Sequence, residues 1–600
     1  MTERIYSRLC FLCATTFAFL VLVGACATID VPVVDPVDMA ERTQNRIERE
    51  IADGSMARAI QQIGVARNAG TIDDEILDRL YDSALAGIAD TARRAVENGD
   101  YRTALIDLEN LAILNGDKKD VGISRDDLLV RLAMKYRDEG NIVAALHYYL
   151  ELDEPARRDP EELASFIRYA AKNKNRLATR RLLETADEFG VDVDQEHRKT
   201  SEAMPDLAEM VAGTVTIWVN RGIRIQRGVG YPDRVIGSGF FIDPRGYIIT
   251  NYHIIESEVD PTYRGYSRLY IRLPDSPDER VPARVVGYDR VFDVALLKVE
   301  VDPEYVFSFS SIRTLRPGTP IYAIGSPGGL YSTITSGIVS ATGRRFFQMG
   351  DALQMDVPIN PGNSGGPVVT SDGDLVGVIF AGIQQFQGVN FAIPSWWIRT
   401  FVPRLYDGGA IKHGWVGAAL HEFADTLTVT YVAPGSPAAE VGLESGDVIS
   451  RVGGLSAKKI ADVQALLLKH EPGHLIELEW RRDDTMRSNL VLLSERPYSP
   501  IEDVVPNESR ENLIPALFGM EISSTGTRFL RRTYVVDHVY PGSIADETGL
   551  SVQDPFSIQN WEIDLDRRTA VMQIVVRQRK AGFLESGVQL GTFIEIDTFF

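Results

Sequence analysis

Ser364 lies in the segment of this sequence that is best suited to carry a reaction. The segment, residues 356–368, reads Asp-Val-Pro-Ile-Asn-Pro-Gly-Asn-Ser-Gly-Gly-Pro-Val. Gly362 and Gly365 permit backbone angles that a side chain forbids, and Pro361 fixes the chain before the serine. The amides around Ser364 can therefore converge on one point, which is the geometry of an oxyanion hole. A Gly-Pro turn with an incidental serine is the competing interpretation of this segment taken alone.

His253 and Asp293 are the two residues that could activate this serine. A serine hydroxyl is a weak nucleophile at neutral pH and needs a neutral imidazole to take its proton. The imidazole needs a carboxylate that fixes its tautomer and stabilises the charged form. His253 follows the run at residues 246–252, and Asp293 opens Asp-Val-Ala-Leu-Leu-Lys-Val. Asp289 is the competing carboxylate, and we expect it to be a loop residue outside the site.

The elements around these side chains are short β-branched and aromatic runs separated by glycine, which predict an all-β sandwich or barrel. We bound this region at residues 204–405 and expect a short helix at 206–212 to lead into it. The order His, Asp, Ser along a β-rich domain fits one convergent version of the catalytic triad. The expected strands are residues 214–219, 237–242, 247–250, 269–273, 283–288, 294–299, 320–324, 337–341, 375–380 and 390–393.

From residue 237 to residue 394 the sequence resembles the HtrA (DegP-like) serine proteases, with a set of sequence blocks in the family's order. The resemblance implies a trypsin-like double β-barrel, no metal or organic cofactor, and assembly as trimers or multiples of trimers. The blocks are Gly237-Ser-Gly-Phe-Phe-Ile, Thr250-Asn-Tyr-His253, Asp293-Val-Ala-Leu-Leu-Lys, Ile324-Gly-Ser-Pro-Gly, Thr335-Ser-Gly-Ile-Val-Ser, Asn360-Pro-Gly-Asn-Ser-Gly-Gly-Pro367 and Gly388-Val-Asn-Phe-Ala-Ile-Pro394.

The same resemblance implies a role for each site residue. Ser364 would attack the scissile carbonyl, His253 would act as general base and then as general acid, and Asp293 would orient His253. The backbone amides of Gly362, Asn363 and Ser364 would form the oxyanion hole.

The resemblance is weaker at the loops that shape the substrate pocket. Ile324-Gly-Ser-Pro-Gly-Gly stands where the family usually has a Gly-Asn-Pro form, and the loops at residues 331–333 and 381–387 have their own sequences. Ile359 and Ile383 near the pocket suggest a small to medium aliphatic side chain before the cleaved bond.

Residues 411–497 resemble a PDZ domain, through Trp415-Val-Gly-Ala-Ala-Leu and the glycine-rich block at 433–454. In that family a loop before a strand binds the terminal carboxylate of a peptide, and the peptide adds a strand to the sheet. The matching loop here consists of Trp415, Val416 and Gly417. A PDZ-shaped structural module without a ligand is the alternative.

A fainter second PDZ-like copy is predicted at residues 508–600. The block at 534–554 parallels the glycine-rich block of the first copy, whereas the helix and closing strands after it are harder to align. We therefore expect a degenerate, structural copy.

Residues 40–195 are rich in helix formers, with apolar residues three and four apart, and predict an all-helical region. Gly99-Asp-Tyr-Arg-Thr-Ala-Leu recurs as Gly140-Asn-Ile-Val-Ala-Ala-Leu, and a poorer copy begins at Asn173, where an asparagine replaces the glycine. Helical hairpins of this kind resemble tetratricopeptide repeats, whose concave surface would bind a partner protein. An irregular helical bundle is the alternative.

The first residues have the layout of a secretory signal, with Arg4 and Arg8 before an apolar run. The run meets Val23-Gly-Ala-Cys26, which resembles a bacterial lipobox and implies a signal peptide at residues 1–26 with lipid attached at Cys26. We expect residues 27–39 to form a tether. A short uncleaved anchor is the alternative. Because Ala27 is not an aspartate, the outer membrane is weakly favoured, with the protein facing the periplasm.

Composition narrows the remaining possibilities. The formal net charge of -21 disfavours binding to nucleic acid, because phosphate backbones favour clustered Lys and Arg. All three cysteines precede residue 27, so we expect no internal disulfide and no thiolate metal site in the mature chain.

The sequence therefore predicts an exported, lipid-anchored serine endopeptidase that cleaves unfolded or misfolded envelope proteins. It would also bind C-terminal peptides at its first PDZ domain. A regulatory protease with a dedicated substrate is one alternative. A non-proteolytic chaperone or scaffold that retains the fold is the other.

Overall fold

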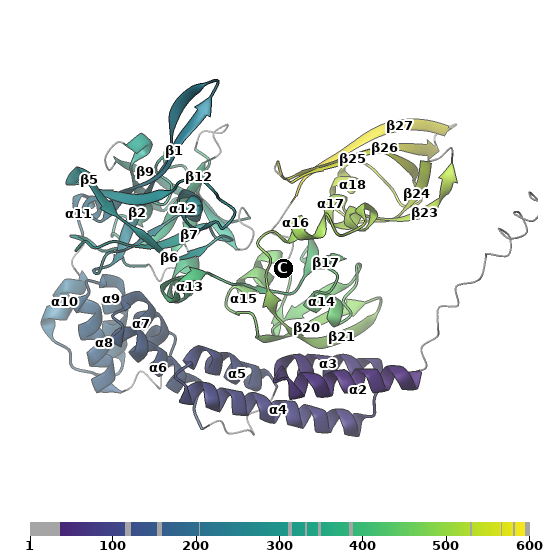
Figure 1. Cartoon of the computed structure of the whole chain (residues 1–600), viewed down its shortest axis with the longest axis horizontal. Coiled ribbons are helices and arrows are strands. Elements are labelled where there is room, and N and C mark those ends of the chain that lie inside the picture. Colours follow the sequence, from purple (N-terminus) through teal and green to yellow (C-terminus); the bar gives the residue numbers. More distant parts are fainter. Residues whose placement is uncertain are drawn as a thin grey trace, which may run out of the picture.

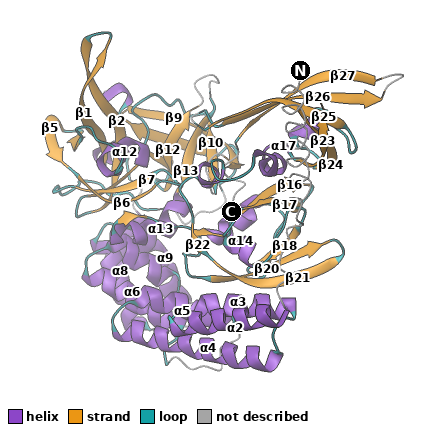
Figure 2. Ribbon diagram, turned by 45° about the vertical axis from the view of Figure 1, so that its right-hand side comes forward, coloured by secondary structure: helices purple, strands orange, loops and turns teal. Residues whose placement is uncertain are grey.

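The computed structural model describes residues 36–114, 122–152, 159–202, 205–309, 315–329, 333–345, 350–382, 388–528, 531–565, 567–579 and 583–594 (Figure 1). A row of helices from the first part of the chain lies beneath both the middle β domain and the first C-terminal β domain. Figure 2 shows helix α13 (Ser395–Asp407), the last helix of the middle domain, at the boundary between that domain and the helical layer.

The N-terminal region is helical, as predicted, and consecutive helices pack against one another along the row. Its first helix begins at Pro36, inside the segment that we expected to be a tether, so the tether prediction extends too far for residues 36–39. The helices are α2 (Pro36–Ala52), α3 (Met56–Ala69), α4 (Asp74–Glu97), α5 (Tyr101–Ile113), α6 (Arg125–Asp138), α7 (Ile142–Leu150), α8 (Pro160–Lys172), α9 (Arg176–Glu188) and α10 (Gln195–Glu202).

The turns inside these hairpins share one backbone geometry. Gly99 and Gly140 have φ of 74° and 75°, and in the third copy Lys174 takes this left-handed conformation with φ 56°. The predicted third copy is therefore misaligned by one residue, because the residue equivalent to the glycines is Lys174 and not Asn173. A lysine bears a cost there that glycine does not, which explains why the copy was hard to see in the sequence.

Every predicted strand of the middle domain overlaps a strand of the structure, and α11 (Leu207–Ala212) confirms the leading helix. The structure adds β5, β10, β11 and the short β14, none of which was predicted. The strands are β1 (Thr214–Gln226), β2 (Val229–Asp243), β3 (Tyr247–Thr250), β4 (Arg268–Leu273), β5 (Ser276–Pro282), β6 (Arg284–Asp289), β7 (Val294–Lys298), β8 (Pro320–Gly325), β9 (Thr333–Arg345), β10 (Asp351–Met355), β11 (Pro367–Thr370), β12 (Leu375–Gly382), β13 (Asn390–Pro394) and β14 (Gly409–Ala410).

These strands form two sheets, each with a hydrophobic cluster of its own, and a third cluster contains buried residues of both sheets. The second sheet is a closed barrel with the order β10-β13-β12-β11-β8-β9. The first has eight strands in the order β14-β6-β7-β3-β2-β1-β4-β5 and is not a closed ring. Of the two barrels that the resemblance implies, the structure thus closes one.

The two C-terminal domains are each built on an antiparallel sheet. The first domain contains α14 (Pro437–Glu440) and α15 (Ile460–Leu467), and its sheet has the order β16-β17-β18-β20-β21. Its strands are β15 (Gly414–Trp415), β16 (Ala418–Phe423), β17 (Thr426–Val432), β18 (Val448–Val452), β19 (Leu455–Ser456), β20 (Leu475–Arg482), β21 (Thr485–Leu492) and β22 (Ser494–Glu495).

The second domain has a sheet in simple chain order, in which β25 turns directly into β26. In the first domain α15 occupies the corresponding connection, so the described part of the second domain lacks that helix. Its elements are α16 (Pro500–Val504), α17 (Ile514–Phe518), β23 (Met520–Arg528), β24 (Arg531–Val539), α18 (Ile544–Glu547), β25 (Pro555–Asp564), β26 (Thr569–Arg579) and β27 (Phe583–Phe593).

The hydrophobic core of the second C-terminal domain extends into the first domain. Ala419 and Tyr431 of the first sheet pack with Phe518 and other apolar residues of the second domain. Ile501 of α16 belongs to the same core, so the second domain begins before residue 508, where we had placed its boundary.

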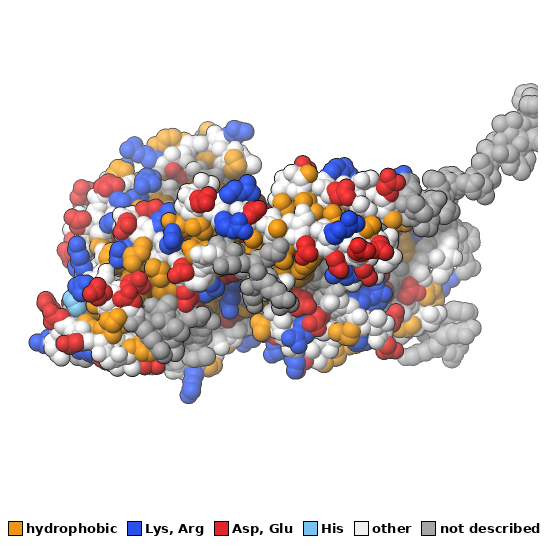
Figure 3. Space-filling model, turned by 90° about the horizontal axis from the view of Figure 1, so that it is seen from below, with side chains coloured by type: hydrophobic (Ala, Val, Ile, Leu, Met, Phe, Trp, Pro, Cys, Tyr) orange, Lys and Arg blue, Asp and Glu red, His pale blue; other side chains and the backbone are white. Residues whose placement is uncertain are grey.

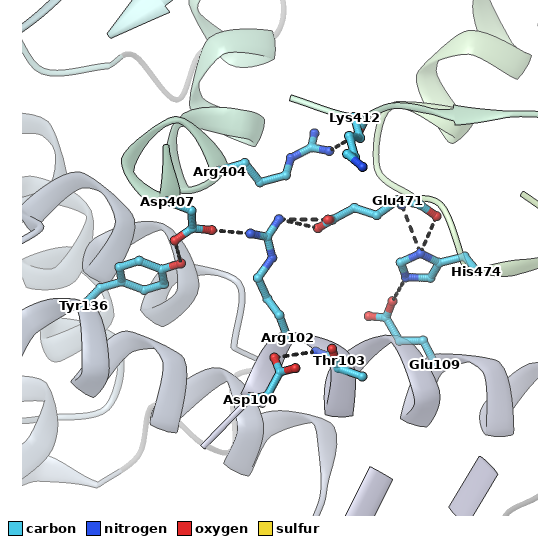
Figure 4. A network of polar contacts seen from close by, with 10 residues as sticks. All are labelled: Asp100, Arg102, Thr103, Glu109, Tyr136, Arg404, Asp407, Lys412, Glu471 and His474. Atoms are coloured by element: carbon cyan, nitrogen blue, oxygen red, sulfur yellow. Dashed lines mark hydrogen bonds and ion pairs between the residues drawn. The ribbon is translucent and has the colours of Figure 1, made fainter. Parts of the chain in front are cut away.

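An ion-pair network joins the helical region to both neighbouring domains (Figure 4). Arg102 of α5 pairs with Asp407 at the end of α13 and donates to both carboxylate oxygens of Glu471, at 2.7 and 2.8 Å, in the first C-terminal domain. Nearby, Nε2 of His474 lies 3.0 Å from Oε2 of Glu109. The helical region therefore contacts the middle domain and the first C-terminal domain at the same place.

The distribution of surface charge and the character of the helices are relevant to the predicted partners and location. Figure 3 shows Lys and Arg side chains interspersed with Asp and Glu over the face seen from below, without a field of one sign. Among the described residues, no helix combines the length and the apolar character needed to cross a bilayer.

Candidate active site

His253 and Asp293 lie together at the end of the first sheet. His253 is in the first turn of α12 (Tyr252–Val259), which directly follows β3, and Asp293 immediately precedes β7, the neighbour of β3. The ring Nδ1 of His253 donates to Oδ2 of Asp293 at 2.7 Å, and the backbone N–H of His253 donates to Oδ1 at 2.7 Å. Both oxygens of one carboxylate thus fix the position and the tautomer of this imidazole.

Asp293 is held in an uncommon backbone conformation. Its φ of 55° is in the left-handed region, which residues other than glycine rarely adopt. Asn251 donates from Nδ2 to the backbone carbonyl of Asp293 at 2.9 Å. A strained residue of this kind persists only where its surroundings hold it, and such residues concentrate at functional sites.

The electrostatics of the pair suit a base that must stabilise a proton. Burial disfavours charge on the His253 ring, but the Asp293 carboxylate and, more weakly, Glu256 favour it, and together they raise the pKa of His253. The His253 side chain is still 45% exposed, whereas that of Asp293 is 11% exposed. The outward face of the imidazole is therefore open to a substrate.

Ser364 packs against the strands that carry His253. The backbone N–H of Ser238 in β2 donates to the carbonyl of Ser364 at 2.8 Å, and Thr250 at the end of β3 donates from Oγ1 to the carbonyl of Ser238 at 2.8 Å. At Gly365, with φ 85°, a Cβ would lie 2.2 Å from the Ser238 carbonyl oxygen, so the close approach requires glycine.

The hydroxyl of Ser364 has a different partner from the one the triad requires. It donates to the carbonyl of Phe380 at 3.4 Å, which is a long and weak hydrogen bond. Catalytic hydrogen bonds are often long or misaligned without substrate, and a serine hydroxyl changes partner by rotating about one bond. The structure thus brings His253 and Asp293 into direct contact and places Ser364 on the adjoining loop.

Two of the three amides expected in the oxyanion hole are available. In the described part of the chain, the backbone N–H groups of Gly362 and Ser364 have no hydrogen-bond partner. The N–H of Asn363 instead donates to the carbonyl of Asn360 at 3.0 Å, so in this structure it does not point a free donor into the predicted oxyanion hole. The Pro361 carbonyl accepts from the amide of Gly328 at 2.7 Å, and since the peptide is planar and trans, the N–H of Gly362 points the opposite way.

A chain of buried hydroxyl groups supports the oxyanion loop, and sequence reasoning missed it. Ser238 donates from Oγ to the carbonyl of Gly362 at 2.7 Å and accepts from the amide of Ser326 at 2.9 Å. Thr216 donates to the hydroxyl of Ser326 at 2.7 Å. The three hydroxyl residues are at most 5% exposed. The Gly-Ser-Gly and Gly-Ser-Pro-Gly blocks contained the relevant serines, but their pairing depends on the fold.

Asp289 lies outside the site, as expected, although it ends β6 instead of lying in a loop. Its Oδ2 accepts from Nε2 of His413 at 2.8 Å, and the side chains are 0% and 2% exposed. The competing carboxylate therefore belongs to a second histidine–carboxylate pair, which nothing in the local sequence indicated.

The predicted peptide-binding loop lies at the beginning of β16, an edge strand of its sheet. Val416 is fully buried. Gly417 has a φ of 91°, and a Cβ added there would lie only 2.2 Å from Cβ of Ser436. The second C-terminal domain repeats this construction, because Gly519 has φ 70° and would place a Cβ 2.1 Å from Cβ of Ser543. Both domains therefore fold their loops in the same way.

A cavity of about 270 Å³ lies between the two C-terminal domains beside β16. His421 of β16 binds the carbonyl of Pro541 across the domain boundary at 2.9 Å. Leu420 and Ile460 line the cavity from the first domain, and Phe518 and Phe593 line it from the second. The edge of β16 thus opens onto a partly apolar space.

Two predicted residues cannot be placed. Cys26 and Ile383 lie outside the described residues, whereas Ile359 is half-buried at the barrel that contains the Ser364 loop. Among the described residues, no cluster of His, Cys, Asp and Glu could hold a metal ion.

Comparison with known proteins shows the family. A model of the trypsin-like peptidase domain matches residues 237–378, a PDZ domain model matches residues 428–482, and the TP0546 family PDZ domain matches residues 501–594. A probable periplasmic serine endoprotease, DegP-like, of Marinomonas sp. (strain MWYL1) is 32% identical over 342 residues, covering 54% of this chain and 71% of that protein. The chain belongs to the DegP-like family of serine endoproteases.

Further relatives of this DegP-like endoprotease have similar coverage. A probable periplasmic serine endoprotease, DegP-like, of Pseudomonas fulva (strain 12-X) is 34% identical over 383 residues, covering 58% of this chain and 78% of that protein. The crystal structure of the serine endoprotease from Yersinia pestis is 28% identical, with a TM-score of 0.40, and covers 48% of this chain and 97% of that chain. The family models and the DegP-like relatives show a serine endoprotease with a trypsin-like domain and two PDZ domains, and they imply peptide or protein substrates.

Proposed function

We propose that His253, Asp293 and Ser364 form the catalytic triad of this endoprotease. The observation that carries the proposal is the double hydrogen bond by which Asp293 holds His253, next to the loop of Ser364. Ser364 attacks the scissile carbonyl while Nε2 of His253 takes its proton, and the amides of Gly362 and Ser364 bind the developing oxyanion. His253 then protonates the leaving amine, and water releases the acyl group by the reverse steps.

Cleavage of an unfolded protein tests this proposal. The purified full chain is incubated with casein beside a Ser364→Ala variant, and the products are followed by gel electrophoresis. We expect cleavage by the native chain and none by the variant, because alanine has no nucleophile. A Ser371→Ala variant, which removes an exposed hydroxyl bound to Asp372, is a matched control that should cleave normally. Cleavage that persists in the Ser364→Ala chain would contradict the assignment of Ser364 as the nucleophile.

We propose that the protein is exported and anchored by lipid at Cys26, and that its substrates are unfolded or misfolded envelope proteins. The support is the lipobox-like sequence and the word periplasmic in the names of the relatives. Mass spectrometry of the mature N-terminus in the native host is the test. A chain that retains residues 1–25, or an unmodified Cys26, would contradict it, and a Cys26→Ala variant should leave the membrane fraction.

The binding modules complete the proposed function. The first PDZ domain binds C-terminal peptides at Trp415, Val416 and Gly417, with β16 as the strand that the peptide extends. The helical region, which we propose to be tetratricopeptide-like, binds a protein partner, and the chain assembles as a trimer or a multiple of trimers. Sedimentation of the full chain tests the assembly, and a monomer at micromolar concentration would contradict it.

Substrate trapping separates general quality control from a dedicated regulatory role. The Ser364→Ala chain is expressed in its host and the bound proteins are identified. A broad set of unfolded envelope proteins supports quality control, whereas one recurrent substrate supports the regulatory alternative. The helical region contacts two other domains, so a partner bound to it would lie near the protease. This arrangement favours the regulatory alternative.

A further inference from the structure

The buried pair of Asp289 and His413 lies at the junction of the protease domain and the first PDZ domain. Asp289 ends β6 of the protease domain, and His413 lies in the connection that leads from α13 to the PDZ domain. The pair is 2.8 Å apart and nearly inaccessible to solvent. A buried ionised carboxylate needs such partners, and the proximity of His413 helps to keep the pKa of Asp289 below its usual range despite burial.

The same carboxylate holds the turn that ends at Asp293. Oδ1 of Asp289 accepts from the backbone amides of Val291 at 2.9 Å and Phe292 at 3.2 Å. The Phe292 ring is fully buried, and its centroid lies 5.9 Å from that of His413. Asp289 and His413 thus fix the residues that immediately precede the left-handed conformation of Asp293.

His413 also forms a hydrogen bond with the PDZ side of the junction. Its backbone carbonyl accepts from the amide of Arg496, which lies just after β22 of the PDZ domain, at 2.9 Å. The next residues, Gly414–Trp415, pair with Ser494–Glu495. The carboxylate-binding loop proposed above therefore begins two residues after the histidine that contacts the Asp293 turn.

We propose that Asp289 and His413 are positioning residues for the catalytic carboxylate of Asp293. The inference rests on the proposed triad. The turn at residues 289–293 presents Asp293 to His253 only while Asp289 is held, and His413 is the side chain that holds it.

Labelling of Ser364 by a fluorophosphonate probe tests the proposal, because the labelling rate reports how well the triad activates the serine. His413→Phe and Asp289→Leu remove the pair, whereas His413→Gln and Asp289→Asn keep a hydrogen bond between the two positions. We expect the two apolar variants to label about tenfold or more slowly, since small displacements of catalytic groups cost up to about a hundredfold. The two conservative variants should label at close to the native rate.

Two further readouts separate positioning from loss of stability. Asp293 and Glu256 are the charged groups that raise the pKa of His253, so a displaced Asp293 should move the acid limb of the labelling profile to lower pH. Hydrogen exchange should quicken at the amides of Val291 and Phe292 in the apolar variants. Because His413 directly precedes the loop at residues 414–417, loss of its contact with Asp289 in the Asp289→Leu variant should also quicken exchange in that loop.

A matched control is His474→Phe, which removes another buried histidine–carboxylate pair between domains, the one that His474 forms with Glu109 (Figure 4). It should label at the native rate with an unmoved acid limb. Equal labelling rates in His413→Phe, Asp289→Leu and native chains would overturn the positioning role, as would slowed labelling with an unmoved acid limb. A native chain that the probe does not label at Ser364 would instead refute the proposed triad itself.

Discussion

Replacement of Ser238 by alanine tests how the oxyanion loop is held. The Ser238 hydroxyl is fully buried and joins two loops, since it donates to the carbonyl of Gly362 and accepts from the amide of Ser326. Ser238→Ala leaves both groups without a partner in a site that excludes water. We expect the variant to fold but to lose both stability and catalytic rate.

The magnitude follows from the groups left unpaired. Each buried polar group without a partner costs about 1–3 kcal/mol, which gives an upper range of about 2–6 kcal/mol if nothing moves. Gly362 has no side chain and a φ of 105°, so its carbonyl can turn and recover part of that cost. This turn displaces the peptide that leads to Ser364. We expect the free energy of unfolding to fall by about 2–3 kcal/mol, and kcat by about 10–100-fold, below the full loss of one oxyanion donor.

Denaturant unfolding and steady-state cleavage of a peptide substrate measure the two effects. Ser395→Ala is the matched control, because Ser395 is also fully buried in the protease domain but its hydroxyl has no partner among the described residues. That control should change both quantities little. A Ser238→Ala chain that is less stable but turns over at the native kcat would refute the role of the hydroxyl chain in shaping the oxyanion hole.

Three further predictions concern the triad and the domain junction. Asp293→Asn should lower kcat by about 10⁴-fold without unfolding the chain, because an amide facing Nδ1 favours the tautomer that cannot accept a proton at Nε2; a loss below about tenfold in cleavage assays would contradict it. Because the pKa of His253 is raised, its protonation should remove the general base at a higher pH than usual. The acid limb of kcat/KM should therefore have its midpoint above about 6.5. A midpoint below this value would contradict the pairing of His253 with Asp293. Arg102→Ala should lower the free energy of unfolding by about 1–3 kcal/mol, since it leaves Asp407 and Glu471 without their shared cation while solvent screens part of the loss; calorimetry that shows no change would contradict this.

The part of the fold that the sequence predicted depends on local signals. The strands with β-branched or aromatic runs were found, whereas β5 was missed because Ser276–Pro282 is polar, contains two prolines and has no fully buried residue. Likewise, β11 follows directly from the Gly-Gly-Pro turn of the Ser364 loop, where the turn signal dominates. Both strands depend on neighbours already in place, because a short strand gains its stability from pairing.

In the candidate site, too, the sequence predicted the features that local patterns mark and missed those that depend on the fold. His253, Asp293 and Ser364 were found because each lies in a distinctive block, and the structure adds the contact between the first two. The pairing of Asp289 with His413 joins residues 124 positions apart, and no local pattern marks either residue. The Asn363 amide was assigned to the oxyanion hole from its place in the block, but its direction is set by one backbone turn.

Among the contacts that hold the first PDZ domain, two sets limit how it can rotate about its connection to the protease. One set is the junction at His413, which joins the domain to the protease through the connecting chain. The other is Arg102, which reaches Glu471 of the PDZ domain and Asp407 of the protease from a helix that belongs to neither. Rotation of the PDZ domain about its connection would separate Arg102 from Glu471, leaving a partly buried carboxylate without its cation. A ligand that moves this domain must therefore supply enough free energy to break the Arg102 contacts as well as those at His413.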